Sequence, residues 1–495
     1  MPQAQTATID FTSSENKSAS ELGGAMPTMV NAIPDAAGVV RRRPGISTWN
    51  TFPSGGASGS PVIGMLAFGE QLVYVTEDRK IHALSTAGDI TELSSASDPT
   101  TLLDGNARPS LISGREMFVV AGGGAIQKWT GSGLSARLQN TGVGGPPPDS
   151  VFLCAIAQRL VAQIAGESGQ IWWTGPLEAY ENWDMSTGGA SYIQAAAKPD
   201  PLVAMWDNTN EVFGFGSETI QVFAPAALAL DENDPNNLLD FAPSRTMNIG
   251  TVSPYAVTPM DDMFAMLDRQ RRCLITDGRT YNDVSKPIAQ VLRSMQSVSD
   301  AWAFRMRFGR FDCIVWMFPT DGFGLMFDTV ASKWCEWRAW GTAPKPVSIT
   351  SAYNWAEQDV FLVGLSDGSI AQLDDSSSTD LSDPITVEMV SGFTNHGTSA
   401  QKHCRTLMLQ FKRTWSDSSA PPYGESPSGH VRISYRDNQG TWNILRDVKL
   451  SDDPNPAVLI RSVGVYRTRQ WKVDYTGTDE IQIVSAQEEF EVLGV

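Results

Sequence analysis

The stretch Gln71-Leu-Val-Tyr-Val-Thr-Glu-Asp-Arg-Lys-Ile81-His-Ala-Leu-Ser85 contains the pattern that decides the fold. A polar residue, Gln71, opens a short apolar run, and a second run begins at Ile81. The polar residues between the two runs have the composition of a tight connection. The stretch therefore predicts two short strands joined by a turn.

The same pattern recurs six more times along the chain, and successive opening residues are 43 to 52 positions apart. A repeat of this size, with several short strands and no helix, is typical of the blades of a β-propeller. One four-stranded blade cannot bury both of its faces, so the repeats are expected to stack on one another. The openers are Gln71, Glu116, Arg159, Glu211, Asp262, Asp312 and Asp359, and the partner runs begin at Ile81, Ile126, Ile171, Ile220, Leu274, Leu325 and Ile370.

Composition divides the chain into three parts. Residues 1–50 are polar and irregular and predict an extended N-terminal arm, whereas the repeats occupy residues 51–380. A Ser-, Thr- and Asp-rich stretch from Asp374 to Asp383 marks a boundary, and residues 381–495 predict a separate antiparallel, β-sandwich-like domain. We therefore expect an all-β protein with a propeller of six or seven blades, in which a strand from the N-terminal segment could complete the last blade.

Two segments depart from the strand pattern. Apolar residues between Val284 and Met295 are spaced for one face of a helix. The acidic stretch from Asp231 to Pro235 predicts a surface loop. It lacks the central Gly and terminal Glu of a calcium-binding loop, so no metal site is expected there.

The chain is acidic, with a formal net charge of −18 and a pI of about 4.7. Solubility is the simplest reason for this charge. The alternative is a surface that nucleic acid passes without sticking, because a grip on phosphates needs Lys and Arg.

One basic trio, Arg41-Arg42-Arg43, precedes Pro44, which favours an extended conformation at Arg43. We expect an exposed turn there. The alternative is docking to an acidic neighbouring subunit, whereas a DNA-binding or nuclear-localisation patch would need more basic residues.

Neither disulfides nor membrane insertion are expected. The five cysteines are odd in number and lack CxxC spacing, so they predict buried free thiols in a protein made in a reducing cytoplasm. The N-terminus lacks the features of a secretory signal, and no apolar stretch approaches 18 residues. Any export is therefore expected to use a non-standard route, such as release by lysis.

The sequence offers no catalytic, cofactor or metal site. His403 and Cys404 are adjacent, so in a strand their side chains point to opposite faces. The segment Gly214-Phe-Gly216 lacks the third glycine and the helix of a dinucleotide loop. Among the other histidines, His82 alternates within a strand, which favours a structural role.

Four tryptophans leave a binding role open. Trp172, Trp173, Trp183 and Trp206 could stack on sugars, or they could fill the core between blades. A receptor- or glycan-binding protein is therefore an alternative, and a propeller glycoside hydrolase is a less favoured one, because no pair of facing carboxylates stands out.

The segment Ser434-Tyr-Arg-Asp437-Asn-Gln-Gly440-Thr-Trp442 resembles the Asp-box turn of sialidase propellers and many phage tail proteins. In those families the Asp box is structural. The resemblance implies a hairpin shaped by Asp437 and Gly440, with Trp442 packing behind it.

Several further segments, in order, resemble one family, the packaged-DNA stabilisation or tail nozzle (tail accessory, tail hub) proteins of short-tailed phages. The matching segments are Arg43-Pro-Gly-Ile46, Glu181-Asn-Trp183 after Ile171-Trp-Trp173, Phe215-Gly-Ser-Glu-Thr-Ile-Gln-Val-Phe223, Gly250-Thr-Val-Ser-Pro254, Asp277-Gly278 and Gly464-Val-Tyr-Arg-Thr-Arg-Gln-Trp471.

The resemblance implies a structural virion protein and not an enzyme. Six copies would form a tube below the head–tail connector of adaptor and portal proteins. The tube would continue the DNA channel, retain the genome until DNA ejection, and anchor a tail needle, fibres or tailspikes. Genomic double-stranded DNA would pass through the lumen without specific binding, and the hexamer would be assembled in the host cytoplasm.

Overall fold

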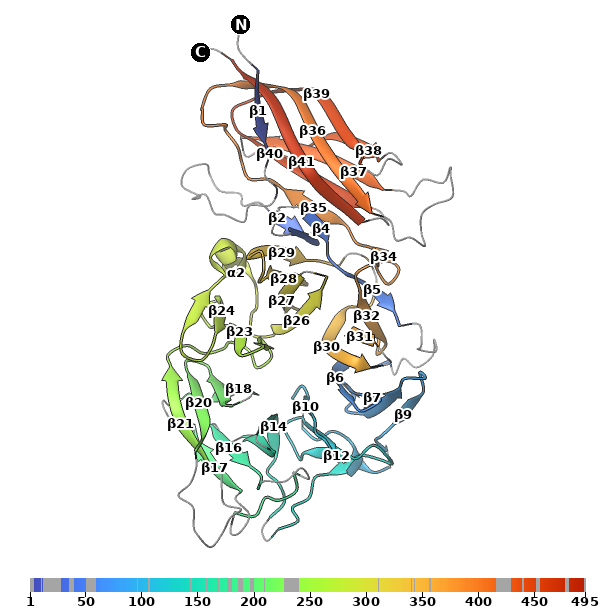
Figure 1. The fold of residues 1–495 in the computed structure, drawn as a ribbon, viewed down its shortest axis with the longest axis vertical. Coiled ribbons are helices and arrows are strands. Elements are labelled where there is room, and N and C mark those ends of the chain that lie inside the picture. The colour runs from blue at the N-terminus through green and yellow to red at the C-terminus, as the bar shows by residue number, and fades with distance from the viewer. Residues whose placement is uncertain are drawn as a thin grey trace. The chain divides into compact units, whose positions relative to one another are not determined.

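The fold is taken from a computed structural model (Figure 1). It describes the whole chain except residues 1–3, 10, 12–27, 35–39, 50–58, 96, 106, 143–144, 157, 167–168, 176–179, 186–189, 196–199, 209, 227–239, 310, 340, 342, 356–357, 415–428, 439, 451–454, 477–479 and 494–495. By internal contacts the chain divides into unit 1, residues 1–47, 306–343 and 373–495, and unit 2, residues 48–305 and 344–372.

Each sequence repeat forms one antiparallel hairpin. In the first repeat, Gln71 begins β7 and Ile81 begins β8, and Tyr74 lies opposite His82. The other six openers likewise lie in, or within two residues of, a strand that pairs with the strand of its partner run. The predicted strand pairs are therefore confirmed.

The hairpins belong to separate meanders in which consecutive strands are neighbours (Figure 1). The first five are β6 (Val62–Phe68), β7 (Gln71–Thr76), β8 (Ile81–Ser85) and β9 (Ile90–Glu92); β10 (Ser110–Ser113), β11 (Phe118–Ala121), β12 (Gln127–Trp129) and β13 (Ala136–Arg137); β14 (Ser150–Ile156), β15 (Arg159–Ile164), β16 (Gln170–Trp173) and β17 (Ser191–Gln194); β18 (Leu202–Asp207), β19 (Val212–Gly216), β20 (Ile220–Ala226) and β21 (Asp240–Met247); β22 (Val257–Met260), β23 (Met263–Leu267), β24 (Cys273–Thr276) and β25 (Tyr281–Asp283).

The last two meanders each start a longer sheet. They are β26 (Trp302–Phe308), β27 (Phe311–Phe318), β28 (Phe323–Asp328) and β29 (Lys333–Trp337); and β30 (Pro346–Trp355), β31 (Gln358–Leu365) and β32 (Ile370–Asp374). The predicted helix is confirmed as α2 (Ala289–Ser294), preceded by the 3-10 turn η2 (Lys286–Ile288), and a second such turn, η1, covers Pro99–Thr101.

The sheets of unit 2 pack face to face through their apolar side chains. One core cluster joins β6–β9 to β10–β13, the next joins β10–β13 to β14–β17, and a large one runs from β14–β17 through β18–β21 to β22–β25. A fourth cluster joins β6–β9 to residues of β31 and β32. The sheets β6–β9, β10–β13, β14–β17 and β18–β21 therefore each pack against a neighbouring sheet on both faces, as the stacking argument requires.

Arg108, just before β10, connects several of these sheets. Its Nε donates to the carbonyl of Ile63, 3.0 Å away, and its Nη2 donates to the carbonyl of Val347. The guanidinium carbon lies 5.5 Å and 5.0 Å from the ring centres of Tyr255 and Trp302. Burial lowers the pKa of Arg108 to about 10, so the side chain stays charged at neutral pH.

In unit 1, N-terminal strands link segments that are distant in sequence. The nine-stranded sheet runs β26-β27-β28-β29-β2-β35-β40-β37-β38, so β2 lies between β29 and β35. It pairs in parallel with β29 and antiparallel with β35. The strands not yet named in this sheet are β2 (Thr28–Val30), β35 (Val387–Val390), β37 (His430–Asp437), β38 (Asn443–Lys449) and β40 (Arg469–Thr476).

A second sheet of unit 1 has the order β3-β4-β41-β36-β39, with β1 also paired to β41. The strand β5 follows β32 in the sheet β30-β31-β32-β5-β33-β34 and pairs in parallel with β33. These strands are β1 (Gln5–Thr8), β3 (Ala32–Pro34), β4 (Val40–Arg42), β5 (Gly45–Thr48), β33 (Thr379–Asp380), β34 (Asp383–Pro384), β36 (Lys402–Thr414), β39 (Ala457–Tyr466) and β41 (Glu480–Val492).

The predicted extended N-terminal arm is not confirmed. Residues 5–8, 28–30, 32–34, 40–42 and 45–48 form strands β1 to β5. Pairing of these strands satisfies backbone groups that a free arm would leave to solvent. The domain boundaries at residues 50 and 380 stay predictions. The acidic segment 231–235 lies outside the described residues.

Candidate functional site

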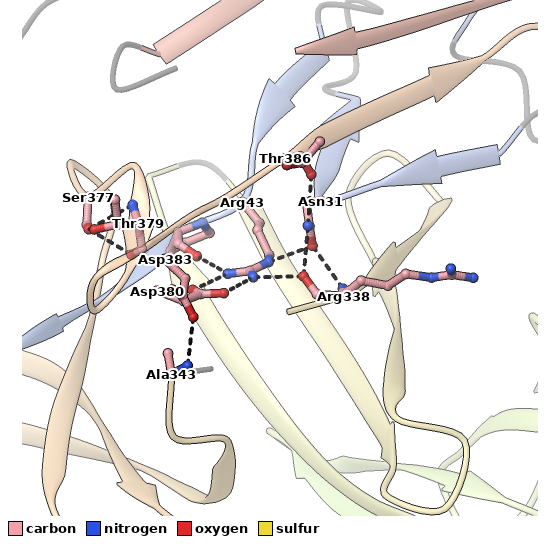
Figure 2. A network of polar contacts seen from close by, with 10 residues as sticks. Asn31, Arg43, Arg338, Ala343, Ser377, Thr379, Asp380, Asp383 and Thr386 are labelled. Atoms are coloured by element: carbon pink, nitrogen blue, oxygen red, sulfur yellow. Dashed lines mark hydrogen bonds and ion pairs between the residues drawn. The ribbon is translucent and has the colours of Figure 1, made fainter. Parts of the chain in front are cut away.

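A buried polar site of unit 1 is built around Asn31, between β2 and β3 (Figure 2). Its backbone has a φ of 55°, in the left-handed region that Asn tolerates better than most residues. The side-chain amide donates to the carbonyls of Arg338, 2.8 Å away, and Thr386, 3.0 Å away. Its oxygen accepts from the Nε of Arg43 at 2.8 Å and the backbone N–H of Arg338 at 2.9 Å. All four bonding positions of the amide are therefore used.

Arg43, between β4 and β5, is the second centre of this site, and its side chain has no exposed surface. Nη1 and Nη2 lie 3.0 Å and 2.5 Å from the two carboxylate oxygens of Asp380. The remaining N–H groups donate to Asn31 and to the carbonyls of Pro44 and Arg338. The guanidinium also lies 4.3 Å from the ring centre of Trp337. All five donors of the side chain are satisfied.

The site can hold chain segments together. It joins the N-terminal segment to the end of β29 and to residues 380–386, as the dashed contacts in Figure 2 show. A buried ion pair is stable only when both charges are paired and hydrogen-bonded, and this one is. Every polar group at its centre is occupied within the protein, so the arrangement is structural.

The expectation of an exposed turn at the arginine trio is wrong for the two arginines whose side chains are described. Arg42 and Arg43 are buried, and Arg43 is paired with Asp380 of the same chain. A run of basic residues predicts an exposed segment, because charged residues are seldom buried unless they are paired. The signal that could have found the pair is the acidic stretch at residues 374–383, which lacks local basic partners.

A second buried arginine lies in the C-terminal part of unit 1. Arg469, in β40, pairs with both carboxylate oxygens of Asp437, at 2.7 Å and 2.9 Å. Its guanidinium carbon lies between three aromatic rings, 4.5 Å from Tyr435, 4.2 Å from Tyr466 and 5.2 Å from Trp471. The structure therefore joins the Asp-box-like segment to the segment Gly464–Trp471, two motifs that the sequence presents separately.

The hairpin expected for the Asp-box-like segment is confirmed, because β37 and β38 pair on either side of it and Gly440 donates to the carbonyl of Asp437. Trp442 does not pack behind the turn as expected. Its side chain is 36% exposed and lies against the guanidinium of Arg436, 4.8 Å from the ring centre.

Next to Arg469 lies a fully buried carboxylate, Glu488. It accepts from the Tyr466 hydroxyl at 2.6 Å and from the Trp471 indole at 3.2 Å, and His396 Nε2 lies 3.4 Å away. Burial raises the pKa of Glu488, but the hydrogen bonds from His396 and Tyr466 outweigh burial and hold it below the ordinary value. The carboxylate therefore stays ionised within this buried network.

The residues considered for chemistry belong to three different sheets. His82 is buried in β8, where its ring stacks on Tyr74 at 4.8 Å. Cys404 is buried in β36, whereas the adjacent His403 is only partly buried, as opposite faces predict. Gly214 and Gly216 lie within β19, where they form no phosphate loop.

All five cysteines are buried free thiols, as predicted. Burial raises the pKa of each thiol, which disfavours the reactive thiolate. Among the described residues no group of three His, Cys, Asp or Glu side chains could hold a metal ion, and no helix is long and apolar enough to cross a membrane.

The four tryptophans considered for sugar stacking differ in burial. Trp173 and Trp183 belong to core clusters, so the core-filling interpretation holds for them. Trp172 and Trp206 are only partly buried against those clusters. The sequence did not distinguish these two pairs, because burial depends on which sheet lies opposite.

Comparison with known proteins identifies one family. The family model described as "Bacteriophage P22 Gp10, beta-propeller" matches residues 25–391, about three quarters of the chain. A search of curated protein sequences finds no match.

Solved structures with a similar arrangement include the computationally designed Ika8 protein, at 12% identity and a TM-score of 0.37, covering 74% of this chain and 100% of that one. Another is BBS1N in complex with ARL6DN, at 12% identity and a TM-score of 0.41, covering 67% of this chain and 97% of that one.

Proposed function

This chain belongs to the β-propeller family of phage P22 Gp10, and we propose that it forms the tail nozzle below the head–tail connector of a short-tailed phage. Family membership supports a structural virion protein that stabilises packaged DNA, and we propose no enzymatic activity for it. The observation that carries the nozzle proposal is the match over residues 25–391, which includes all seven sequence repeats.

We infer that each repeat is one blade and that the propeller has seven. The seven meanders described above support this number, and β5 follows β32 in its sheet, which gives the last meander a fourth strand from the N-terminal segment. A cryo-EM map of the virion tail would test the number directly. A ring of six blades would overturn it.

In the proposed assembly six copies form a ring. The adaptor and portal proteins lie on the connector side of this ring. A tail needle, fibres or tailspikes would be anchored on the distal side. A ring of identical copies needs a subunit that keeps its shape. The fully satisfied contacts of Arg43 and Asn31 support such rigidity, because they fix the N-terminal segment within the fold.

The net charge of −18 supports a lumen that lets DNA slide. An acidic wall repels phosphates, whereas attraction to many phosphates would slow DNA exit during ejection. In this proposal the lumen wall contacts the retained genome without binding it specifically. A cryo-EM map that shows basic side chains gripping the DNA would contradict this part of the proposal.

The decisive experiment is quantitative mass spectrometry of purified phage particles, with the portal protein as internal standard. We expect about half as many copies of this chain as of portal, since six copies would match a twelve-fold connector. Absence of the chain from particles would refute the virion location. A copy number equal to that of portal would refute the six-fold ring.

A further inference from the structure

The last two strands of the β14–β17 sheet carry a stacked aromatic pair, of which one ring is exposed. Trp172 in β16 lies directly opposite Tyr192 in β17, and their rings stack with centres 5.4 Å apart and planes 22° from parallel. Gln170 and Gln194 form the next pair on the same face, because side chains two positions apart point the same way. One sheet face thus presents two aromatic rings beside two amides.

This face is only partly covered by the neighbouring sheet. Trp172 packs at the margin of the core cluster shared with β10–β13, whereas Tyr192 lies outside that cluster and is 52% exposed. The facing sheet ends in a strand of two residues, β13. Tyr192 is therefore accessible to a ligand from solvent. The ring of Trp172 stacks against the ring of Tyr192 and holds it in place.

The chemistry of the face selects an uncharged ligand. All four side chains are neutral, so the face lacks the Lys and Arg charge on which strong binding to a phosphate backbone depends. A pyranose ring matches it, because its C–H face is apolar and its hydroxyls donate and accept hydrogen bonds.

The amide of Gln170 is suitably placed for such a ligand. Its oxygen accepts from the Trp172 indole N–H at 3.1 Å, which fixes the amide beside the rings. Its Nε2 has no hydrogen-bond partner among the described residues, and can donate to a hydroxyl.

We propose that Trp172 and Tyr192, flanked by Gln170 and Gln194, form a binding platform for a neutral pyranose oligosaccharide. This goes beyond the nozzle function, and neither depends on the other. A purely structural aromatic pair would stabilise the hairpin through cross-strand packing. It would not bind sugar, so ligand binding separates the two roles.

The test uses the purified full chain. Maltoheptaose, cellohexaose, dextran and the surface polysaccharide of a susceptible host are titrated, with binding followed by saturation-transfer NMR and by tryptophan fluorescence. We expect at least one of them to bind wild type and Tyr192→Ala to bind it about tenfold or more weakly. Tyr281→Ala is the matched control, since Tyr281 is 47% exposed on β25, and it should bind like wild type.

Two further variants keep the outcome interpretable. Tyr192→Phe retains the ring and should bind within about threefold of wild type. Gln170→Ala leaves both rings in place and should weaken binding. The proposal is overturned if wild type binds none of the four at millimolar concentration, or if Tyr192→Ala and Tyr281→Ala have the same effect. Either result leaves the copy number in particles, and hence the nozzle proposal, untouched.

Discussion

Arg43 and Asp380 form a bidentate ion pair, although 337 positions separate them in the sequence. The Nη1–Oδ1 and Nη2–Oδ2 distances are 3.0 Å and 2.5 Å. The pair is buried on both sides. It fixes the strand that follows Arg43 next to the strand that contains Asp380, since Ile46 of β5 pairs with Asp380 of β33. The ion pair and the backbone pairing of β5 with β33 therefore hold the same two segments together.

Removal of one partner of this pair should be strongly destabilising. Arg43→Ala leaves the buried Asp380 carboxylate unpaired, which costs about 3–5 kcal/mol in the free energy of unfolding. Arg43→Lys keeps a charge but loses the fork that bonds both oxygens, so an intermediate loss is expected. Urea unfolding followed by circular dichroism measures both. Arg461→Ala, at an exposed position of β39, is the control and should change stability by less than about 0.5 kcal/mol.

Asn31 should show two separable contributions. Asn31→Gly keeps the left-handed backbone but removes four hydrogen bonds, and we expect a loss of about 2–4 kcal/mol in the free energy of unfolding. Asn31→Ala removes the same bonds and adds backbone strain at a φ of 55°, so it should lose about 1 kcal/mol more. The same urea titration compares the two variants. Equal stabilities would show that the positive φ carries no strain.

Asp207, the last residue of β18, should make stability depend on pH. Burial raises the pKa of its carboxyl to about 6, although the Cys154 thiol donates a hydrogen bond that partly opposes this. The folded-state pKa lies above the unfolded one of about 4, so the folded chain holds the proton more tightly. The resulting stability is present below about pH 4 and is lost as pH rises through about 6.

Asp207→Asn removes this pH dependence. At pH 8 the variant should be more stable than wild type by about 2 kcal/mol, and near pH 4 the two should be alike. Thermal unfolding at a series of pH values between 4 and 8 measures the difference. Asp89→Asn, at an exposed turn, is the control and should follow wild type at every pH. A constant difference between Asp207→Asn and wild type would rule out titration of Asp207 as the cause.

Glu488 should give stability the opposite pH dependence to that given by Asp207. Its folded-state pKa lies below the ordinary value because of the hydrogen bonds from His396 and Tyr466, despite burial. The stability that this carboxylate contributes is therefore present above the unfolded pKa and is lost as pH falls through the folded one. Glu488→Gln should unfold more easily than wild type at pH 7, with a smaller difference at low pH. A pH-independent difference would count against the ionised carboxylate as the stabilising species.

The hairpins could be predicted from sequence because they are local. The opener and the partner run of each repeat are about ten positions apart, so one short stretch such as Gln71–Ser85 contains both strands and their connection. The same holds for α2 and for the hairpin at Asp437. In each case, pattern and turn chemistry lie within one window of the chain.

The sequence was less informative where the partner is distant. The strands β2, β3 and β4 have three residues each, too few for alternation to be recognised. The exposed position of Trp442 was not expected either. Each of these features depends on which side chains and strands lie next to the segment in the folded chain.

The sequence by itself determined the repeat, the strand pairs within each repeat, the family and the absence of a disulfide pattern. Only the tertiary structure decided where the N-terminal strands go, that Arg43 is buried against Asp380, and that Tyr192 is open to solvent beside Trp172. The physical reason is that backbone hydrogen bonds are alike for every strand. Which distant strand becomes the neighbour, and which charge is buried, is settled by the packing of side chains that the linear order keeps far apart.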